Sequence, residues 1–184
     1  MKRLLPALAL VLALSFAVPL HAADEFREIK WEVLVPKGWD PVKDLKGLDL
    51  AKLQDSDPRA IEALEKLKAA WDAAPTDAAL AGAKVRLPGF AIPLENKAGK
   101  VAEFLLVPYF GACIHTPPPP ANQIVHVVLK RPVSNLHSMD TVNVSGTLRL
   151  KAATTPWGNA GYRIDAEKVE NFSPAPPPED KRRR

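Results

Sequence analysis

The residues whose types and spacing could do chemistry gather in one stretch, residues 107–120. It holds Cys113, the only cysteine of the chain, and His115 two positions later. Gly111 lets the backbone turn without a Cβ penalty. Four consecutive prolines at 117–120 fix φ and remove amide donors, so the stretch cannot run through the centre of a sheet. The sequence therefore predicts a shaped loop that carries a thiol and an imidazole.

A metal ion is one ligand that such a loop could hold. In an extended chain Cys113 and His115 point to the same side, because strand side chains alternate. Thiolate and imidazole together suit Zn²⁺ or copper, and His126 or His137 could complete the set. Met139 adds a thioether that suits Cu(I). The Cys-x-His spacing alone is not diagnostic of a zinc site.

Other roles stay open for the same residues. Cys113 could be a buried structural thiol, since one cysteine cannot form an internal disulfide. It could also be a nucleophile activated by His115, although the sequence identifies no residue that would orient His115. A single histidine within an apolar run, such as His126, is more often structural than a ligand. Sequence motifs for haem attachment, phosphate loops and zincins are absent.

Protein binding is a further class of function. A run of prolines adopts a polyproline II helix that presents a rigid ridge, and aromatic side chains beside it make good contact residues. The same prolines could equally serve as a strap that holds the loop in place. The predicted contact residues are Tyr109, Phe110, Pro117, Pro118, Pro119, Pro120 and Trp157.

The first residues indicate export. Lys2 and Arg3 precede an apolar run over residues 4–20 and then small residues, which is the pattern of a cleaved signal peptide over residues 1–23. Two prolines interrupt the run, which is at the short end for a membrane anchor. We therefore expect a periplasmic protein with no transmembrane segment in the mature chain.

Charge argues against a nucleic-acid partner. The formal net charge is +4, of which Lys2 and Arg3 supply +2. The other +2 comes from the end of the tail, residues 179–184, with four basic and two acidic side chains. The folded body is close to neutral and lacks the basic face that binds nucleic acid.

The proline-rich tail, residues 173–184, has no core residues and is predicted to be disordered.

The elements around the loop are mostly strands. Apolar segments, several with strict alternation, predict strands over residues 28–35, 84–94, 100–107, 124–129, 141–150 and 162–169. Gly146 permits the sharp bend of a closing barrel strand, and Pro88-Gly89 predicts a bend or bulge in its own strand. A short hairpin is expected around Trp157.

One helix and these strands predict the fold. Asp57 is a favourable N-cap with Pro58 at the first helical position, and apolar residues then recur at helical spacing to about Ala73. A short turn is expected over residues 78–83. We predict a mainly β fold over residues 24–172, an OB-like small closed barrel with a helical insertion, with a β-sandwich as the alternative.

The loop sequence resembles the hallmark of an exported bacterial family, the domain of unknown function 3299. The resemblance is carried by Tyr109-Phe110-Gly111-Ala112-Cys113-Ile114-His115-Thr116 and the prolines that follow. It covers about residues 31–172. It implies a periplasmic protein, sometimes encoded beside an ABC-type transport system and a protein predicted to bind metal. It supplies no catalytic residues. Some members carry a lipid anchor, for which this chain lacks the required cysteine.

These observations predict a periplasmic accessory protein with a rigid loop. The loop binds a transition metal, zinc or copper, or it docks to an envelope transport assembly. An interaction module without metal, with Cys113 as a buried structural thiol, is the alternative. A thiol-dependent enzyme is the second alternative.

Overall fold

The computed structural model describes residues 25–45, 53–54, 56–113 and 118–171. The strands are β1 (Arg27–Glu28), β2 (Lys84–Pro93), β3 (Asn96–Lys97), β4 (Lys100–Val107), β5 (Val125–Ser134), β6 (Thr141–Arg149), β7 (Ala153–Thr155), β8 (Gly158–Ala160) and β9 (Tyr162–Asn171). The helices are α1 (Pro58–Asp72) and the short 3₁₀ turns η1 (Trp31–Leu34), η2 (Lys43–Leu45), η4 (Ala78–Leu80) and η5 (Ala121–Gln123). The predicted signal peptide and tail lie outside the described residues.

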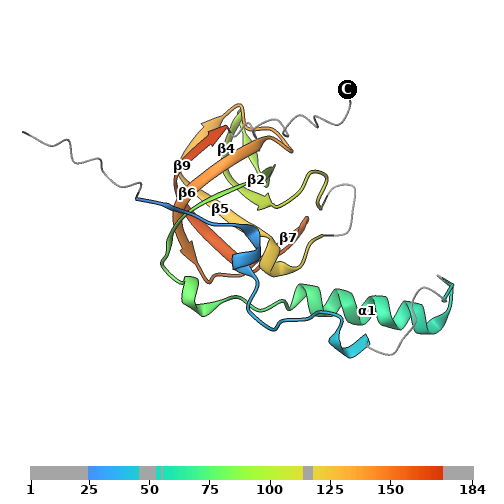
Figure 1. Cartoon of the computed structure of the whole chain (residues 1–184). Coiled ribbons are helices and arrows are strands. Elements are labelled where there is room, and N and C mark those ends of the chain that lie inside the picture. The colour runs from blue at the N-terminus through green and yellow to red at the C-terminus, as the bar shows by residue number, and fades with distance from the viewer. Residues whose placement is uncertain (1–24, 46–52, 55, 114–117, 172–184) are drawn as a thin grey trace, which may run out of the picture.

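Within the part of the chain that the structure describes, five strands close into a barrel (Figure 1). Their order around the barrel is β2, β6, β9, β5 and β4, and β4 pairs with β2 again. All these pairings are antiparallel except that of β5 with β9. The first barrel strand thus lies between the second and the fourth, and the third runs parallel to the fifth. This is the OB arrangement, and it confirms the predicted closed barrel over the β-sandwich.

Two glycines allow the strands to bend tightly enough for closure. β2 pairs with β6 up to Phe90 and with β4 from Phe90 onward. A Cβ on Gly89 would lie 2.8 Å from the carbonyl oxygen of Val107, so only glycine fits the bend. The register between β6 and β9 shifts at Gly146, where a Cβ would overlap the carbonyl of Asp165. Both predicted bends are confirmed.

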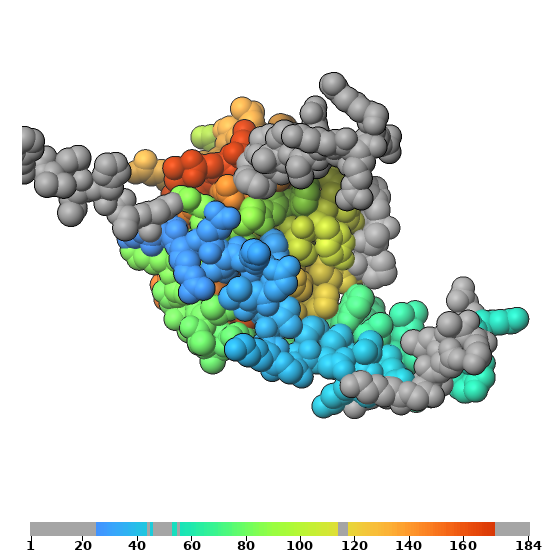
Figure 2. Space-filling model, in the orientation of Figure 1, coloured from blue at the N-terminus to red at the C-terminus, as the bar shows by residue number. Residues whose placement is uncertain are grey.

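The predicted strand over residues 28–35 is wrong. Of that range only Glu28 pairs, as the second residue of β1 beside β2, and the chain then turns through η1. Leu34 is fully buried against the barrel core, and the indole of Trp31 donates a 2.7 Å hydrogen bond to the carbonyl of Pro88. Because these contacts are with the barrel itself, the segment closes one end of it. Figure 2 shows this N-terminal segment, in blue, lying over the barrel.

The predicted helix and the turn that follows it are confirmed. Asp57 caps α1 by accepting a 2.9 Å hydrogen bond from the backbone of Arg59, and η4 forms the predicted turn. α1 extends away from the barrel (Figure 1). Ala63 is its one buried residue, and Leu64 is 68% exposed. No helix among the described residues is long and apolar enough to cross a membrane.

Candidate functional site

The predicted loop leaves the barrel at Val107 and packs against the outside of β2 and β4. Phe104 and Leu106 point into the barrel core, so their neighbours Leu105 and Val107 face outward. The outward residues form a second apolar group, here called the outer cluster. Its buried members are Ile92, Leu105, Val107, Ala112, Ile124 and Ala160.

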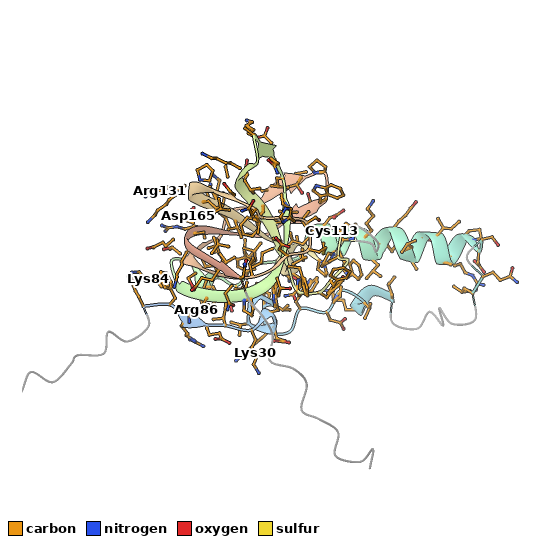
Figure 3. All side chains as sticks on the ribbon, turned by 90° about the horizontal axis from the view of Figure 1, so that it is seen from above. Lys30, Lys84, Arg86, Cys113, Arg131 and Asp165 are labelled. Carbon is orange, nitrogen blue, oxygen red and sulfur yellow. The ribbon has the colours of Figure 1, made fainter. Side chains whose placement is uncertain are left out.

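Cys113 rests on the outer cluster as a half-buried thiol. Burial raises the pKa of the thiol to about 11, so it is protonated at neutral pH. Met139 packs on the same cluster, and its Sδ accepts a 3.3 Å hydrogen bond from the backbone of Gly111. Figure 3 places Cys113 on the flank of the barrel toward α1, away from Lys84. A neutral thiol in this position packs as a small apolar group.

Of the predicted histidine ligands, His115 lies outside the described residues, and His126 and His137 each contact a carboxylate. His126 places Nε2 2.7 Å from Oε2 of Glu103, and its side chain is 14% exposed. His137 is largely exposed, with Nδ1 3.4 Å from Oδ2 of Asp140. Among the described residues no three His, Cys, Asp or Glu side chains gather as a metal site would require. Metal binding by Cys113 and His115, with His126 or His137, stays a prediction.

The three aromatic residues predicted to contact a partner all reach solvent. Tyr109 is 44% exposed, Phe110 68% and Trp157 39%. Phe110 meets Phe90 edge to face, with ring centroids 5.9 Å apart and an interplanar angle of 80°. We call Tyr109, Phe110 and Trp157 the aromatic surface.

Trp157 lies on a hairpin that shares its support with the loop. The hairpin consists of β7 and β8, and Ala153 and Ala160 from it pack in the outer cluster. A Cβ on Gly158 would lie 3.1 Å from both Pro118 and Ile124, so the turn beside Trp157 touches the proline run directly. The loop that carries Tyr109 and Phe110 and the hairpin that carries Trp157 therefore pack on the same outer cluster.

The prolines of the loop divide between surface and interior. Pro118 is exposed, Pro119 is buried and Pro120 is half-buried, while Pro117 lies outside the described residues. Pro118 lines a cleft of about 330 Å³ whose other walls come from α1, including Leu67 and Trp71. Pro119 thus anchors this end of the loop, and Pro118 remains at the surface.

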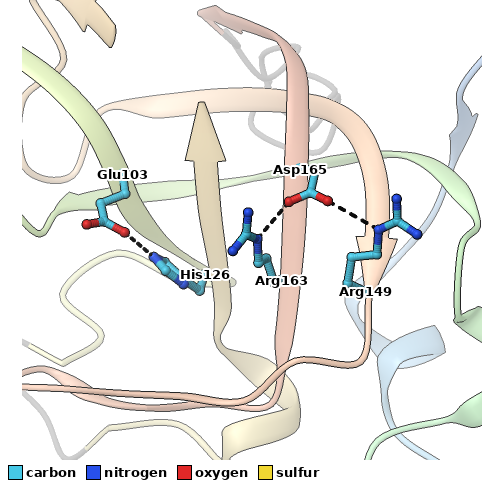
Figure 4. A network of polar contacts seen from close by, with 5 residues as sticks. All are labelled: Glu103, His126, Arg149, Arg163 and Asp165. Carbon is cyan, nitrogen blue, oxygen red and sulfur yellow. Dashed lines mark hydrogen bonds and ion pairs between the residues drawn. The ribbon is translucent and has the colours of Figure 1, made fainter. Parts of the chain in front are cut away.

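A row of polar and charged side chains lies on the outer wall of the barrel, and the sequence singles out only His126 among them. It crosses β4, β5, β9 and β6, and Figure 4 shows its members Glu103, His126, Arg163, Asp165 and Arg149. Asp165 accepts from Arg163 at 2.7 Å and from Arg149 at 3.2 Å. Burial works to raise the pKa of Asp165, but these hydrogen bonds hold it below its usual value. We call this set the polar row.

Comparison with known proteins identifies the family. The family model described as protein of unknown function (DUF3299) matches residues 31–171. The crystal structure of a DUF3299 family protein from Pseudomonas aeruginosa PAO1 is similar with a TM-score of 0.60 and 37% identity, over 80% of this chain and 97% of that chain. A small single-stranded DNA-binding protein from Streptomyces coelicolor matches with a TM-score of 0.33 and 17% identity, over 50% of this chain and 94% of that one. No curated protein matches. As the resemblance predicted, the chain belongs to the DUF3299 family of proteins of unknown function.

Proposed function

We propose that this chain is a periplasmic accessory protein that docks to a component of an envelope transport assembly through the aromatic surface. The observation that carries the proposal is the joint exposure of Tyr109, Phe110 and Trp157 on two segments that share one apolar support. Aromatic residues are enriched at the centres of protein interfaces, where they bury large areas at little entropic cost. Exposing several aromatic rings to water is unfavourable, and such exposed apolar patches are typical of protein interaction sites.

Rigidity supports the same function. Pro119 is buried, and the turn at Gly158 touches both Pro118 and Ile124. On the other side of the loop, Ala112 is buried in the outer cluster and the ring of Phe110 packs on Phe90. These contacts hold the aromatic rings in place, which lowers the entropy lost on binding. The transport assembly is the partner that the family resemblance implies, and the signal-peptide pattern of residues 1–23 supports an envelope location for this chain.

The test is site-specific photo-crosslinking in living cells. A benzoyl-phenylalanine probe replaces Tyr109, Phe110 or Trp157 in turn, and the crosslinked products are identified by mass spectrometry. The proposal expects a component of an ABC-type transport system to be captured from all three positions. The matched control is Lys130 on β5, whose side chain is 70% exposed. No product from any aromatic position, or the same product from Lys130, would reject the proposal.

A transition-metal role is the second candidate, favoured by one observation. Cys113 and the thioether of Met139 lie on the same outer cluster, and thiol with thioether is a ligand pair for Cu(I). The test is elemental analysis of protein purified without a His tag, with Cys113→Ala as the control. Stoichiometric zinc or copper that the variant loses supports the role. Equal metal content in both proteins rejects it.

A further inference from the structure

The last strand of the barrel ends two strands away from the part of β2 that supports Phe110. On β6, Val142 pairs with Gly89 of β2 on one side and with Asn171, the last residue of β9, on the other. Neighbouring strands lie about 4.8 Å apart, so the backbone of Asn171 is about 10 Å from that of Gly89. The next residue of β2 is Phe90, whose ring contacts Phe110. The chain after Asn171 therefore starts two strands away from the residue that supports Phe110.

The exposed rings of Tyr109 and Phe110 suit a proline-rich ligand. Phe90 supports Phe110 edge to face, which leaves Phe110 68% exposed, with Tyr109 next to it in the chain. Proline-rich segments bind aromatic-lined surfaces because their rings pack on aromatic side chains at a small entropic cost. A polyproline II backbone has no internal hydrogen bonds, so its carbonyls are free to accept one from a phenol such as that of Tyr109.

The chain itself carries such a segment in the right place. Residues 172–184 follow Asn171 and include Pro174, Pro176, Pro177 and Pro178. In a polyproline II conformation residues 172–178 would span about 22 Å, at about 3.1 Å per residue. That reach is about twice the separation between Asn171 and β2. We propose that residues 173–178 dock on Tyr109 and Phe110 of the same molecule.

The covalent connection explains why a weak contact is enough. A short linker holds the segment at an effective concentration of order millimolar, so docking needs little intrinsic affinity. A protein partner at the aromatic surface would have to displace the tail. The inference goes beyond the proposed function and does not require it, because tail docking takes place in the isolated chain.

The experiment uses the purified full-length chain with a benzoyl-phenylalanine probe in place of Phe110. After illumination, mass spectrometry maps the crosslinks. We expect an internal crosslink from position 110 to residues 173–178. It is lost when Pro174, Pro176, Pro177 and Pro178 are all changed to serine, a change that leaves the charge of the tail intact. A probe in place of Tyr109 serves as a second reporter if the first variant does not fold.

Lys130 provides a control matched for reach. Its Nζ lies 3.8 Å from Oε2 of Glu167 on β9, four residues before Asn171 and thus about 13 Å from it along the strand. A tail that only sweeps through solvent would crosslink to probes at Phe110 and Lys130 alike, and that result would overturn the inference. So would a crosslink that survives the serine changes.

A mixture of ¹⁵N-labelled and unlabelled chains separates docking within one molecule from docking between two. Crosslinks that join labelled to unlabelled peptides would assign the tail to a second copy and overturn the proposal. Because no partner protein is present, a negative result here leaves the proposed docking to a transport component standing.

Discussion

The phenol of Tyr162 donates a 2.8 Å hydrogen bond to the carbonyl of Leu34, 128 residues earlier in the chain. The same oxygen accepts a 2.5 Å hydrogen bond from the backbone of Asp77. Tyr162 lies at the start of the last barrel strand and is fully buried. One side chain thus ties the segment that closes the barrel end, and the turn after α1, to the barrel itself.

Removing this hydroxyl should destabilise the fold. Tyr162→Phe leaves the carbonyl of Leu34 and the amide of Asp77 without their partner, and an unsatisfied buried group costs about 1–3 kcal/mol. Urea unfolding of the variant should show a loss in that range. The control is Tyr109→Phe at an exposed ring, where the change should stay within about 0.5 kcal/mol. Equal effects of the two substitutions would contradict the role given to Tyr162.

The bend of β6 should not tolerate a side chain at Gly146. A Cβ there would overlap the carbonyl of Asp165 and press on Ile164. Overpacking of this kind costs about 1–3 kcal/mol. Gly146→Ala should therefore lower the free energy of unfolding by that amount, measured in urea. Thr147→Ala, at a half-buried position next along the strand, should cost much less.

The polar row should make stability depend on pH in the acid range. The hydrogen bonds from Arg163 and Arg149 hold the pKa of Asp165 below its usual value. Its contribution is therefore present above the unfolded pKa of about 3.9 and is lost as the pH falls through the folded pKa. Because the carboxylate is a third exposed, Asp165→Asn should cost only about 0.2–1 kcal/mol at pH 7. The difference between variant and parent should shrink towards pH 3, and a constant difference would contradict this reading.

The thiol of Cys113 should react slowly in the native protein. Its pKa is raised to about 11 from an ordinary value of 9.0, and the thiolate is the reactive form. At pH 8 the native thiolate fraction is therefore about 100-fold below that of the unfolded chain. Iodoacetamide labelling followed by mass spectrometry should show a difference of at least that order. Labelling as fast in buffer as in denaturant would mean an accessible, activated thiol.

Local patterns in the sequence predict most of the barrel. The alternation along Thr141–Arg149, with Gly146 in its middle, anticipates β6 and its bend, and Asp57 with Pro58 anticipates the start of α1. The alternation around Trp31 predicts the wrong structure, because Leu34 packs in the barrel core and its carbonyl accepts a hydrogen bond from Tyr162, 128 positions away. Nothing local to residues 28–35 encodes that contact.

The aromatic surface and the polar row also differ in how far the sequence predicts them. The exposure of Tyr109 and Phe110 follows from a loop bounded by prolines, which the sequence displays. The polar row depends on the order of strands around the barrel. Arg163 and Asp165 stand at outward positions of an alternating strand, a visible signal, but His126 becomes their neighbour only through the parallel pairing of β5 with β9.

The three aromatic rings should bind the partner as one surface. The most direct measurement places the photo-crosslinking probe at Trp157 and changes Tyr109 and Phe110 to serine in the same chain. Both substituted positions are exposed, so the fold should be retained and should be verified by an unchanged melting temperature. The crosslink from position 157 to the transport component should disappear. A crosslink of undiminished yield in the folded variant would contradict it.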